Sequence, residues 1–106
     1  MSIFNIFVRK DINEGVRSFR ESKNAILLDV RTREEYEGGH IEGSRNLPLD
    51  EIDRVESVIK DKNAPVYVYC LSGGRSARAA AYLKGKGYLD VHDIGGIGSY
   101  RGKIVV

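Results

Sequence analysis

The chain has 106 residues, enough for one hydrophobic core and too few for two, so we expect a single domain over residues 1–106. Hydrophobic residues make up 42% of the chain and charged residues 30%, a balance typical of a folded soluble protein rather than a disordered one. Lysine and arginine number 17 against 15 aspartate and glutamate, so the net charge of +2 gives no support for nucleic-acid or membrane binding.

A few residues bear on cellular location and metal binding. Residues 1–8 are mostly apolar, but no basic region precedes them and they are too short for a secretory signal or a membrane span. We therefore expect a cytoplasmic protein. Cys70 is the only cysteine, and His40 and His92 are the only histidines, so the sequence predicts neither an internal disulfide nor a structural zinc site.

Strand-like and helix-like segments alternate along the chain. A nearly continuous apolar run, residues 25–30, predicts a strand buried on both faces of a parallel sheet. A β-branched and aromatic run, residues 66–69, predicts a second such strand. Weaker strand patterns occur at residues 3–7, 45–47 and 91–94. This alternation predicts an α/β domain with a mainly parallel sheet.

The first predicted helices begin at recognisable capping residues. Asp11 with Glu14, and Thr32 with Glu35, have the spacing in which the first side chain caps an early helical N–H and the second reaches back. Asp50 is predicted to cap the next helix. The apolar stripe of that helix is formed by Ile52, Val55, Val58 and Ile59.

Cys70 stands where the predicted strand 66–69 ends and a turn, residues 71–76, leads into an alanine-rich helix over residues 76–84. Catalytic groups in such sheets lie just beyond the carboxyl ends of the strands, where N–H groups at a helix start stabilise an anion. We therefore predict that Cys70 is a reactive nucleophile rather than a buried structural thiol. Ionising most of a thiol at neutral pH means lowering its pKa by about two units, or about 2.7 kcal/mol. A helix dipole supplies about 0.3–1 kcal/mol, so loop N–H groups and a nearby cation must supply the rest.

The turn residues have the chemistry of an anion pocket. Gly73 and Gly74 permit the positive φ angles that turn backbone N–H groups inward. Arg75 is the nearest cation and can hold an oxyanion in bidentate fashion. Ser72 and Ser76 can donate hydrogen bonds to a bound sulfur, although Ser76 is equally suited to cap the helix. The spacing fits phosphate, arsenate, a persulfide or thiosulfate alike.

Several motifs together resemble the rhodanese-like sulfurtransferase family. The loop over residues 70–76 is similar to the active-site loop of these proteins. Further similar segments follow in the family's order, at residues 28–31, 34–36, 39–44, 46–48 and 95–97. The resemblance implies a mainly parallel five-stranded sheet flanked by helices. Tyr100 stands near the position where many relatives have a tryptophan.

The resemblance also implies a sulfurtransferase that needs no cofactor. By this analogy Cys70 attacks the outer sulfur of a small anionic donor such as thiosulfate and expels sulfite. The acceptor of the persulfide sulfur is then a thiol, cyanide or another protein. Asp29, Arg31 and His40 lie in matching segments, and we predict that they fix loops through hydrogen bonds and ion pairs. The N–H groups expected to hold the substrate belong to Leu71, Ser72, Gly73, Gly74, Arg75 and Ser76.

Two other functions stay open at this point. A cysteine-dependent phosphatase or arsenate reductase uses the same thiol chemistry. Related phosphatases have five residues between cysteine and arginine, which surround a tetrahedral phosphate, whereas four separate Cys70 from Arg75. The other alternative is a non-enzymatic rhodanese-like module that binds a partner protein. Such modules often lack the cysteine, so its presence favours the enzyme.

Overall fold

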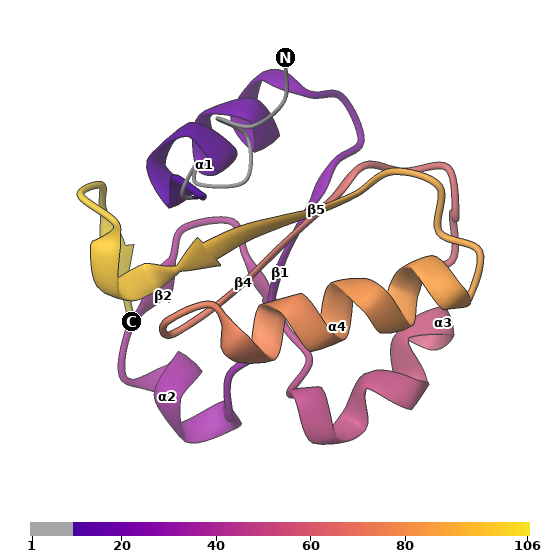
Figure 1. Ribbon diagram of the computed structural model, residues 1–106. Coiled ribbons are helices and arrows are strands. Elements are labelled where there is room, and N and C mark those ends of the chain that lie inside the picture. The colour runs from indigo at the N-terminus through magenta and orange to yellow at the C-terminus, as the bar shows by residue number, and fades with distance from the viewer. Residues whose placement is uncertain (1–9) are drawn as a thin grey trace, which may run out of the picture.

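The computed structural model describes residues 10–106, so the strand predicted at residues 3–7 lies outside the described part. The central sheet has four parallel strands, in the order β3 (Arg45–Asn46), β1 (Ile26–Asp29), β4 (Val66–Cys70) and β5 (Val91–Gly96) (Figure 1). The predicted α/β fold with a mainly parallel sheet is confirmed. Within residues 10–106 the sheet has four strands, where the family resemblance implied five for the whole chain.

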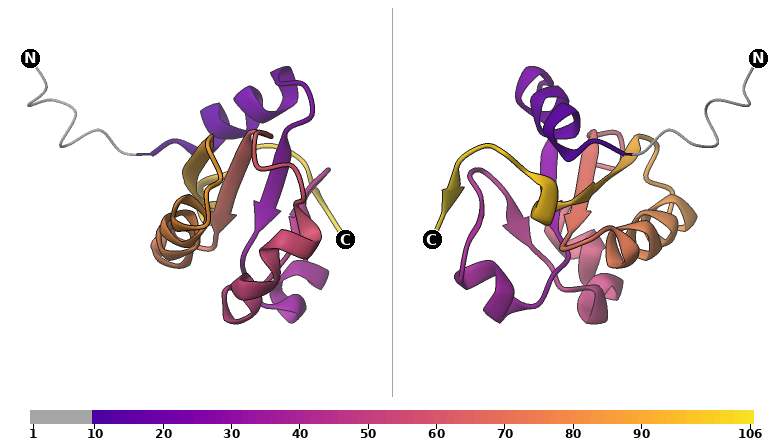
Figure 2. Two further views of the ribbon diagram at one scale, coloured as in Figure 1. Left: turned by 90° about the vertical axis from the view of Figure 1, so that its right-hand side faces the viewer. Right: turned by 60° about the vertical axis from the view of Figure 1, so that its left-hand side comes forward.

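Helices cover both faces of this sheet. α1 (Ile12–Glu21) lies on one face, whereas α3 (Val55–Val58) and α4 (Gly74–Gly85) lie on the other (Figures 1 and 2). The sheet is therefore the middle layer of three, and β1 and β4 in its centre are almost completely buried, as their apolar runs predict. Among the described residues, no helix is long and apolar enough to cross a membrane.

The side chains of β4 alternate between two cores. Val66, Val68 and Cys70 pack in the cluster on the α4 side. Tyr67 and Tyr69 pack in the cluster on the α1 side. This alternation follows from the pleat of a strand, in which successive side chains point to opposite faces. The sulfur of Cys70 therefore lies on the face of the sheet where α4 begins.

The segment that follows β1, which contains α2 (Arg33–Glu37) and β2 (His40–Ile41), lies beside the carboxyl end of β4. α2 begins with the predicted capping box: the Glu35 N–H donates to Thr32 Oγ1 at 3.2 Å, and the Thr32 N–H donates to Glu35 Oε1 at 2.8 Å. β2 then pairs antiparallel with β6 (Ile104–Val105), a contact that sequence analysis did not predict. A short 3₁₀ helix, η3 (Ile97–Ser99), follows β5.

The predicted cap of α1 is half formed. Asp11 accepts a hydrogen bond from the Asn13 N–H at 2.9 Å and so caps the helix as expected. Glu14 does not reach back, because its carboxylate pairs with Arg17 at 2.9 Å.

The prediction that Asp50 caps a helix was wrong. Asp50 lies inside a 3₁₀ helix, η2 (Leu49–Arg54), whose N-cap is Pro48. The Leu49 N–H donates to the Val30 carbonyl at 3.0 Å, and Pro48 has a φ of −55°, so the chain has already turned before Asp50.

Candidate active site

Cys70 is the last residue of β4, the strand between β1 and β5. α4 begins at Gly74, two residues earlier than the predicted 76, so three residues separate the strand from the helix. In Figure 1 this short turn lies at the same end of the sheet as α2. The location at the carboxyl end of a central parallel strand agrees with the prediction from the sequence.

The backbone of the turn points its N–H groups at the sulfur. The Gly73 N–H donates to Cys70 Sγ at 3.0 Å, and the Ser76 N–H donates to it at 3.3 Å. Ser76 Oγ lies 3.6 Å from the sulfur. The thiol is buried, with 1% of Cys70 exposed, yet the neighbouring amides face it. Such an arrangement stabilises a thiolate that has little contact with water.

Burial and hydrogen bonding act on the Cys70 thiol in opposite directions. Burial raises the pKa of Cys70, because the thiolate loses contact with water. Hydrogen bonds to the sulfur together outweigh this effect, so the pKa of Cys70 lies below its ordinary value. These bonds come from the hydroxyl and N–H groups of Ser76 and from the N–H groups of Gly73 and Ser72.

The glycines shape the turn at specific positions. Gly73 has a φ of +111°, the left-handed conformation that glycine alone adopts easily. Gly74 needs no such freedom, because it begins α4 with an ordinary φ, contrary to the expectation that both glycines curl the loop. Gly96 in β5 lies against the turn, and a Cβ there would overlap the Leu71 carbonyl oxygen. The Gly98 N–H donates to the same oxygen at 3.1 Å. Contacts from β5 and η3 therefore fix the position of the Leu71 carbonyl in the turn.

Ser76 does not cap α4, since the N-cap is Gly73, but it is central to the site. Its side chain is fully buried, and its hydroxyl lies 2.7 Å from Asp93 Oδ1 and 3.0 Å from the Gly73 carbonyl oxygen. Asp93, on β5, was missed by sequence analysis. A carboxylate within the short strand 91–94, where its polar neighbour is His92, was the available signal.

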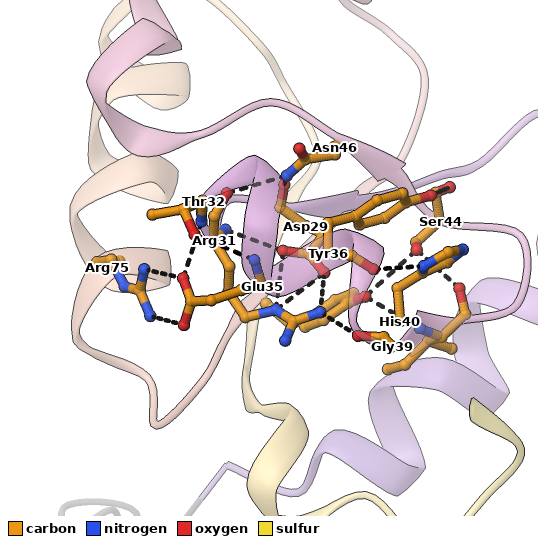
Figure 3. A network of polar contacts seen from close by, with 12 residues as sticks. Asp29, Arg31, Thr32, Glu35, Tyr36, Gly39, His40, Ser44, Asn46 and Arg75 are labelled. Carbon is orange, nitrogen blue, oxygen red and sulfur yellow. Dashed lines mark hydrogen bonds and ion pairs between the residues drawn. The ribbon is translucent and has the colours of Figure 1, made fainter. Parts of the chain in front are cut away.

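Arg75 has a protein partner that sequence analysis did not anticipate. Its guanidinium is bidentate on Glu35, with Nη1–Oε1 at 2.7 Å and Nη2–Oε2 at 3.0 Å (Figure 3). The hydrogen bonds from Arg75 lower the pKa of Glu35 to about 2, so this carboxylate is ionised at neutral pH. Glu35 therefore both closes the capping box of α2 and holds the first turn of α4.

The residues after β1 form a buried polar network beside this pair. Arg31 forms an ion pair with Asp29, with Nη2–Oδ2 at 2.7 Å, and its guanidinium also donates to the Gly39 carbonyl at 2.7 Å (Figure 3). Both charged side chains are nearly inaccessible, with 6% of Arg31 and none of Asp29 exposed. His40 stacks on Tyr36 with ring centroids 3.7 Å apart. These contacts fit the predicted role of fixing loops.

Two hollows lie near Cys70, one against the turn and one beside the start of α4. One, of about 530 Å³, lies against Leu71, Ser72 and Asp93, and Leu71 is 48% exposed at its edge. The other, of about 180 Å³, is lined by Arg75 and Arg78. A small molecule in the larger hollow therefore meets the turn itself, whereas one in the smaller hollow meets the first turns of α4. Within residues 10–106, no three His, Cys, Asp or Glu side chains come together as metal ligands would.

Comparison with known proteins gives a consistent result. Residues 13–103 match the rhodanese-like domain family. The chain is 41% identical over 83 residues to the uncharacterized protein YqhL of Bacillus subtilis, an alignment that covers 77% of this chain and 65% of YqhL. It is 39% identical over 71 residues to the thiosulfate sulfurtransferase PspE of Escherichia coli, covering 66% of this chain and 68% of PspE. The chain thus spans about two thirds of these two relatives.

A solved structure extends the likeness to three dimensions. A rhodanese from E. coli, solved with anions, superposes with a TM-score of 0.71 at 35% identity, covering 76% of this chain and 96% of that chain. The family match includes β1, β4, β5 and the whole turn around Cys70. On these grounds the chain belongs to the rhodanese-like domain family.

Proposed function

We propose that this protein is a sulfurtransferase that carries sulfane sulfur as a persulfide on Cys70. The observation that supports this most is the position of the sulfur at the end of β4, within hydrogen-bond distance of the Gly73 and Ser76 N–H groups. These groups favour the thiolate, which is the attacking form of cysteine. The activity for which PspE is named, thiosulfate sulfurtransferase, supports the same reaction.

The reaction is a transfer in two halves. The Cys70 thiolate attacks the outer sulfur of thiosulfate, a new S–S bond forms, and the S–S bond of thiosulfate breaks as sulfite leaves with the electron pair. An acceptor nucleophile, such as cyanide or a thiol, then attacks the terminal sulfur of the persulfide, and the Cys70 thiolate is restored. Because the first product leaves before the acceptor reacts, ping-pong kinetics are expected.

The turn would hold the persulfide through its backbone. Gly73 and Ser76 already donate to Sγ, and the first N–H groups of α4 lack carbonyl partners within the helix. A terminal sulfur that carries the negative charge is stabilised by such N–H groups. The proposed persulfide site therefore consists of the backbone of residues 71–76 around Cys70.

Arg75 is proposed to steer the anionic donor in competition with Glu35. Its side chain is 33% exposed and lines the smaller hollow together with Arg78, so a donor that enters there meets two cations and one carboxylate, Asp50. Thiosulfate carries two negative charges and can take over hydrogen bonds that Glu35 now accepts. Because Arg75 must first leave Glu35, the ion pair weakens the affinity for the donor.

A phosphatase or arsenate reductase is less well supported. A tetrahedral phosphate or arsenate bonded to the sulfur needs a wide ring of amides around it, but only four residues separate Cys70 from Arg75, where related phosphatases have five. A role limited to binding a partner protein does not require a thiol with a lowered pKa.

Steady-state kinetics test the proposal. We expect the wild type to transfer sulfur from thiosulfate to cyanide with parallel double-reciprocal plots, to turn over p-nitrophenyl phosphate far more slowly, and to lose sulfur transfer in Cys70→Ser. Faster turnover of the phosphate ester would support a phosphatase instead. Sulfur transfer that survives in Cys70→Ser would rule out Cys70 as the carrier.

A further inference from the structure

The Ser76 hydroxyl lies among three acceptors for its hydrogen, and two of them, Asp93 and the Cys70 thiolate, are anions. Ser76 Oγ is 2.7 Å from Asp93 Oδ1 and 3.6 Å from Cys70 Sγ, and the Gly73 carbonyl oxygen lies 3.0 Å away. A hydroxyl has one hydrogen to donate. Ser76 is fully buried, so its hydroxyl does not hydrogen-bond to bulk water. Whichever anion receives this hydrogen is stabilised at the expense of the other.

The protonation state of Cys70 decides which arrangement is favoured. When Cys70 is a thiol, its S–H can donate to Ser76 Oγ while the Ser76 O–H donates to the Asp93 carboxylate, so both hydrogens are used. When Cys70 is a thiolate, the sulfur has no hydrogen to give and needs a donor. Rotation of the Ser76 O–H toward sulfur supplies one, but Asp93 then loses its shortest hydrogen bond.

Asp93 keeps other partners when it releases this hydrogen. Its Oδ1 also accepts from the Gly95 N–H at 3.2 Å, and its Oδ2 lies 3.2 Å from Lys10 Nζ. The Asp93 side chain is 10% exposed and borders the 530 Å³ hollow, whereas Lys10 is 58% exposed. Asp93 thus has two further partners, the Gly95 N–H and Lys10, when it releases the Ser76 hydrogen.

The remaining charges near the sulfur are paired with one another. Arg75, on α4, acts electrostatically on Cys70, but its guanidinium is held by Glu35 of α2. The charges after β1, Asp29 and Arg31, form their own buried pair. Among the described residues, Asp93 is the carboxylate that contacts the sulfur's own hydrogen-bond donor.

We infer that the Ser76 hydroxyl is a hydrogen-bond switch between Asp93 and Cys70, and that Asp93 is a positioning residue that controls how readily Cys70 ionises. Its role in turnover rests on the proposed function. Sγ is charged as the free thiolate and neutral in the persulfide, where the charge lies on the terminal sulfur. The hydrogen therefore points to Sγ before attack, returns to Asp93 in the persulfide, and points to Sγ again when the acceptor removes the sulfur.

The pH dependence of Cys70 alkylation by iodoacetamide, followed by intact mass, tests this inference. Asp93→Asn removes an anion and a competitor, so we expect the pKa of Cys70 to fall by about one unit and alkylation below that pKa to become about tenfold faster. The plateau rate at high pH should not change. The matched control is Asp90→Asn. Asp90 is an exposed carboxylate that precedes the same strand and pairs with His92. An unchanged or higher Cys70 pKa in Asp93→Asn would overturn the switch, as would an equal shift in Asp90→Asn.

Ser76→Ala separates competition for the hydrogen from plain charge repulsion. In the Ser76→Ala background, Asp93→Asn should accelerate alkylation by about threefold or less, because only the direct field of the carboxylate remains. The full tenfold effect in that background would overturn the switch. Should Asp93→Asn fail to fold, Lys10→Met gives the opposite perturbation at an exposed position: Asp93 loses a cation, holds the hydrogen more firmly, and alkylation slows by about twofold. Alkylation that is unchanged or faster in Lys10→Met would contradict the inference.

Failure of the switch and failure of the proposed function give different results. Alkylation needs no sulfur donor, whereas the proposed function requires uptake of sulfur from thiosulfate. Shifted alkylation profiles without sulfur uptake would leave the switch intact and remove the sulfurtransferase. Sulfur uptake with an unshifted Asp93→Asn profile would remove only the switch.

Discussion

The ion pair between Arg75 and Glu35 makes a prediction that connects stability with donor binding. Glu35→Gln keeps an acceptor for the Thr32 N–H but removes the charge that holds Arg75. The lowering of the Glu35 pKa from 4.5 to about 2 corresponds to about 3 kcal/mol if no water screened the pair. Both side chains are close to one-third exposed, so we expect Glu35→Gln to lose about 1–2 kcal/mol of unfolding free energy. The Tm should fall by about 5–15 °C.

The stabilisation by the Glu35 carboxylate should depend on pH in the acid range. The pKa of Glu35 in the folded protein lies below its ordinary value, so its contribution is present above pH 4.5 and is lost as the pH falls toward about 2. The difference in unfolding free energy between wild type and Glu35→Gln should therefore shrink over that range. Glu51→Gln, which removes a similarly exposed carboxylate paired with Arg54, is the matched control and should change stability by less than about 0.5 kcal/mol.

The same substitution should improve donor binding. Arg75 no longer has to leave a carboxylate, and a gain of about 1 kcal/mol corresponds to a KM for thiosulfate about fivefold lower. In the Arg75→Ala background, Glu35→Gln should leave this KM unchanged. A KM that rises or stays constant in Glu35→Gln alone, measured with saturating cyanide, would refute the idea that Glu35 and the donor compete for Arg75.

Two further substitutions test the frame of the site. Gly96→Ala places a methyl group against the Leu71 carbonyl, so it should cost about 1–3 kcal/mol in denaturant unfolding and slow Cys70 alkylation. Gly85→Ala, where a Cβ meets no neighbour, should do neither, and equal behaviour of the two variants would contradict the bracing role of β5. Arg31→Met leaves the Asp29 carboxylate buried without its partner and should cost about 3–5 kcal/mol; a loss below 1 kcal/mol in the same assay would show that Asp29 finds another partner.

Local patterns were sufficient to predict where Cys70 lies in the fold. The apolar run of β4, the glycine at 73 and the alanine-rich helix are adjacent in the chain, and together they place Cys70 at the carboxyl end of a buried strand. The capping box of Thr32 and Glu35 was predicted for the same reason, since its two hydrogen bonds span only three residues. Asp50 shows the limit of such signals: a capping residue type was present, but a long-range hydrogen bond between Leu49 and Val30 set the start of the helix.

The contacts that sequence analysis missed join segments far apart in the chain. Ser76 meets Asp93 because β5 lies beside β4 in the sheet, and strand order is not encoded in either segment alone. Arg75 meets Glu35 across 40 residues because α2 and the start of α4 share one end of the sheet. Arg75, Glu35 and Ser76 each had a plausible local role, as anion ligand, capping residue and helix cap, which concealed the partner that the fold provides.

Formation of the persulfide tests the central claim most directly. After incubation with thiosulfate and removal of excess donor, the intact mass of the wild type should rise by about 32 Da, the mass of one sulfur, and cyanide should reverse the change. Cys70→Ser should gain nothing under the same conditions. An unchanged mass in the wild type, or the same adduct in Cys70→Ser, would contradict sulfur transfer through Cys70.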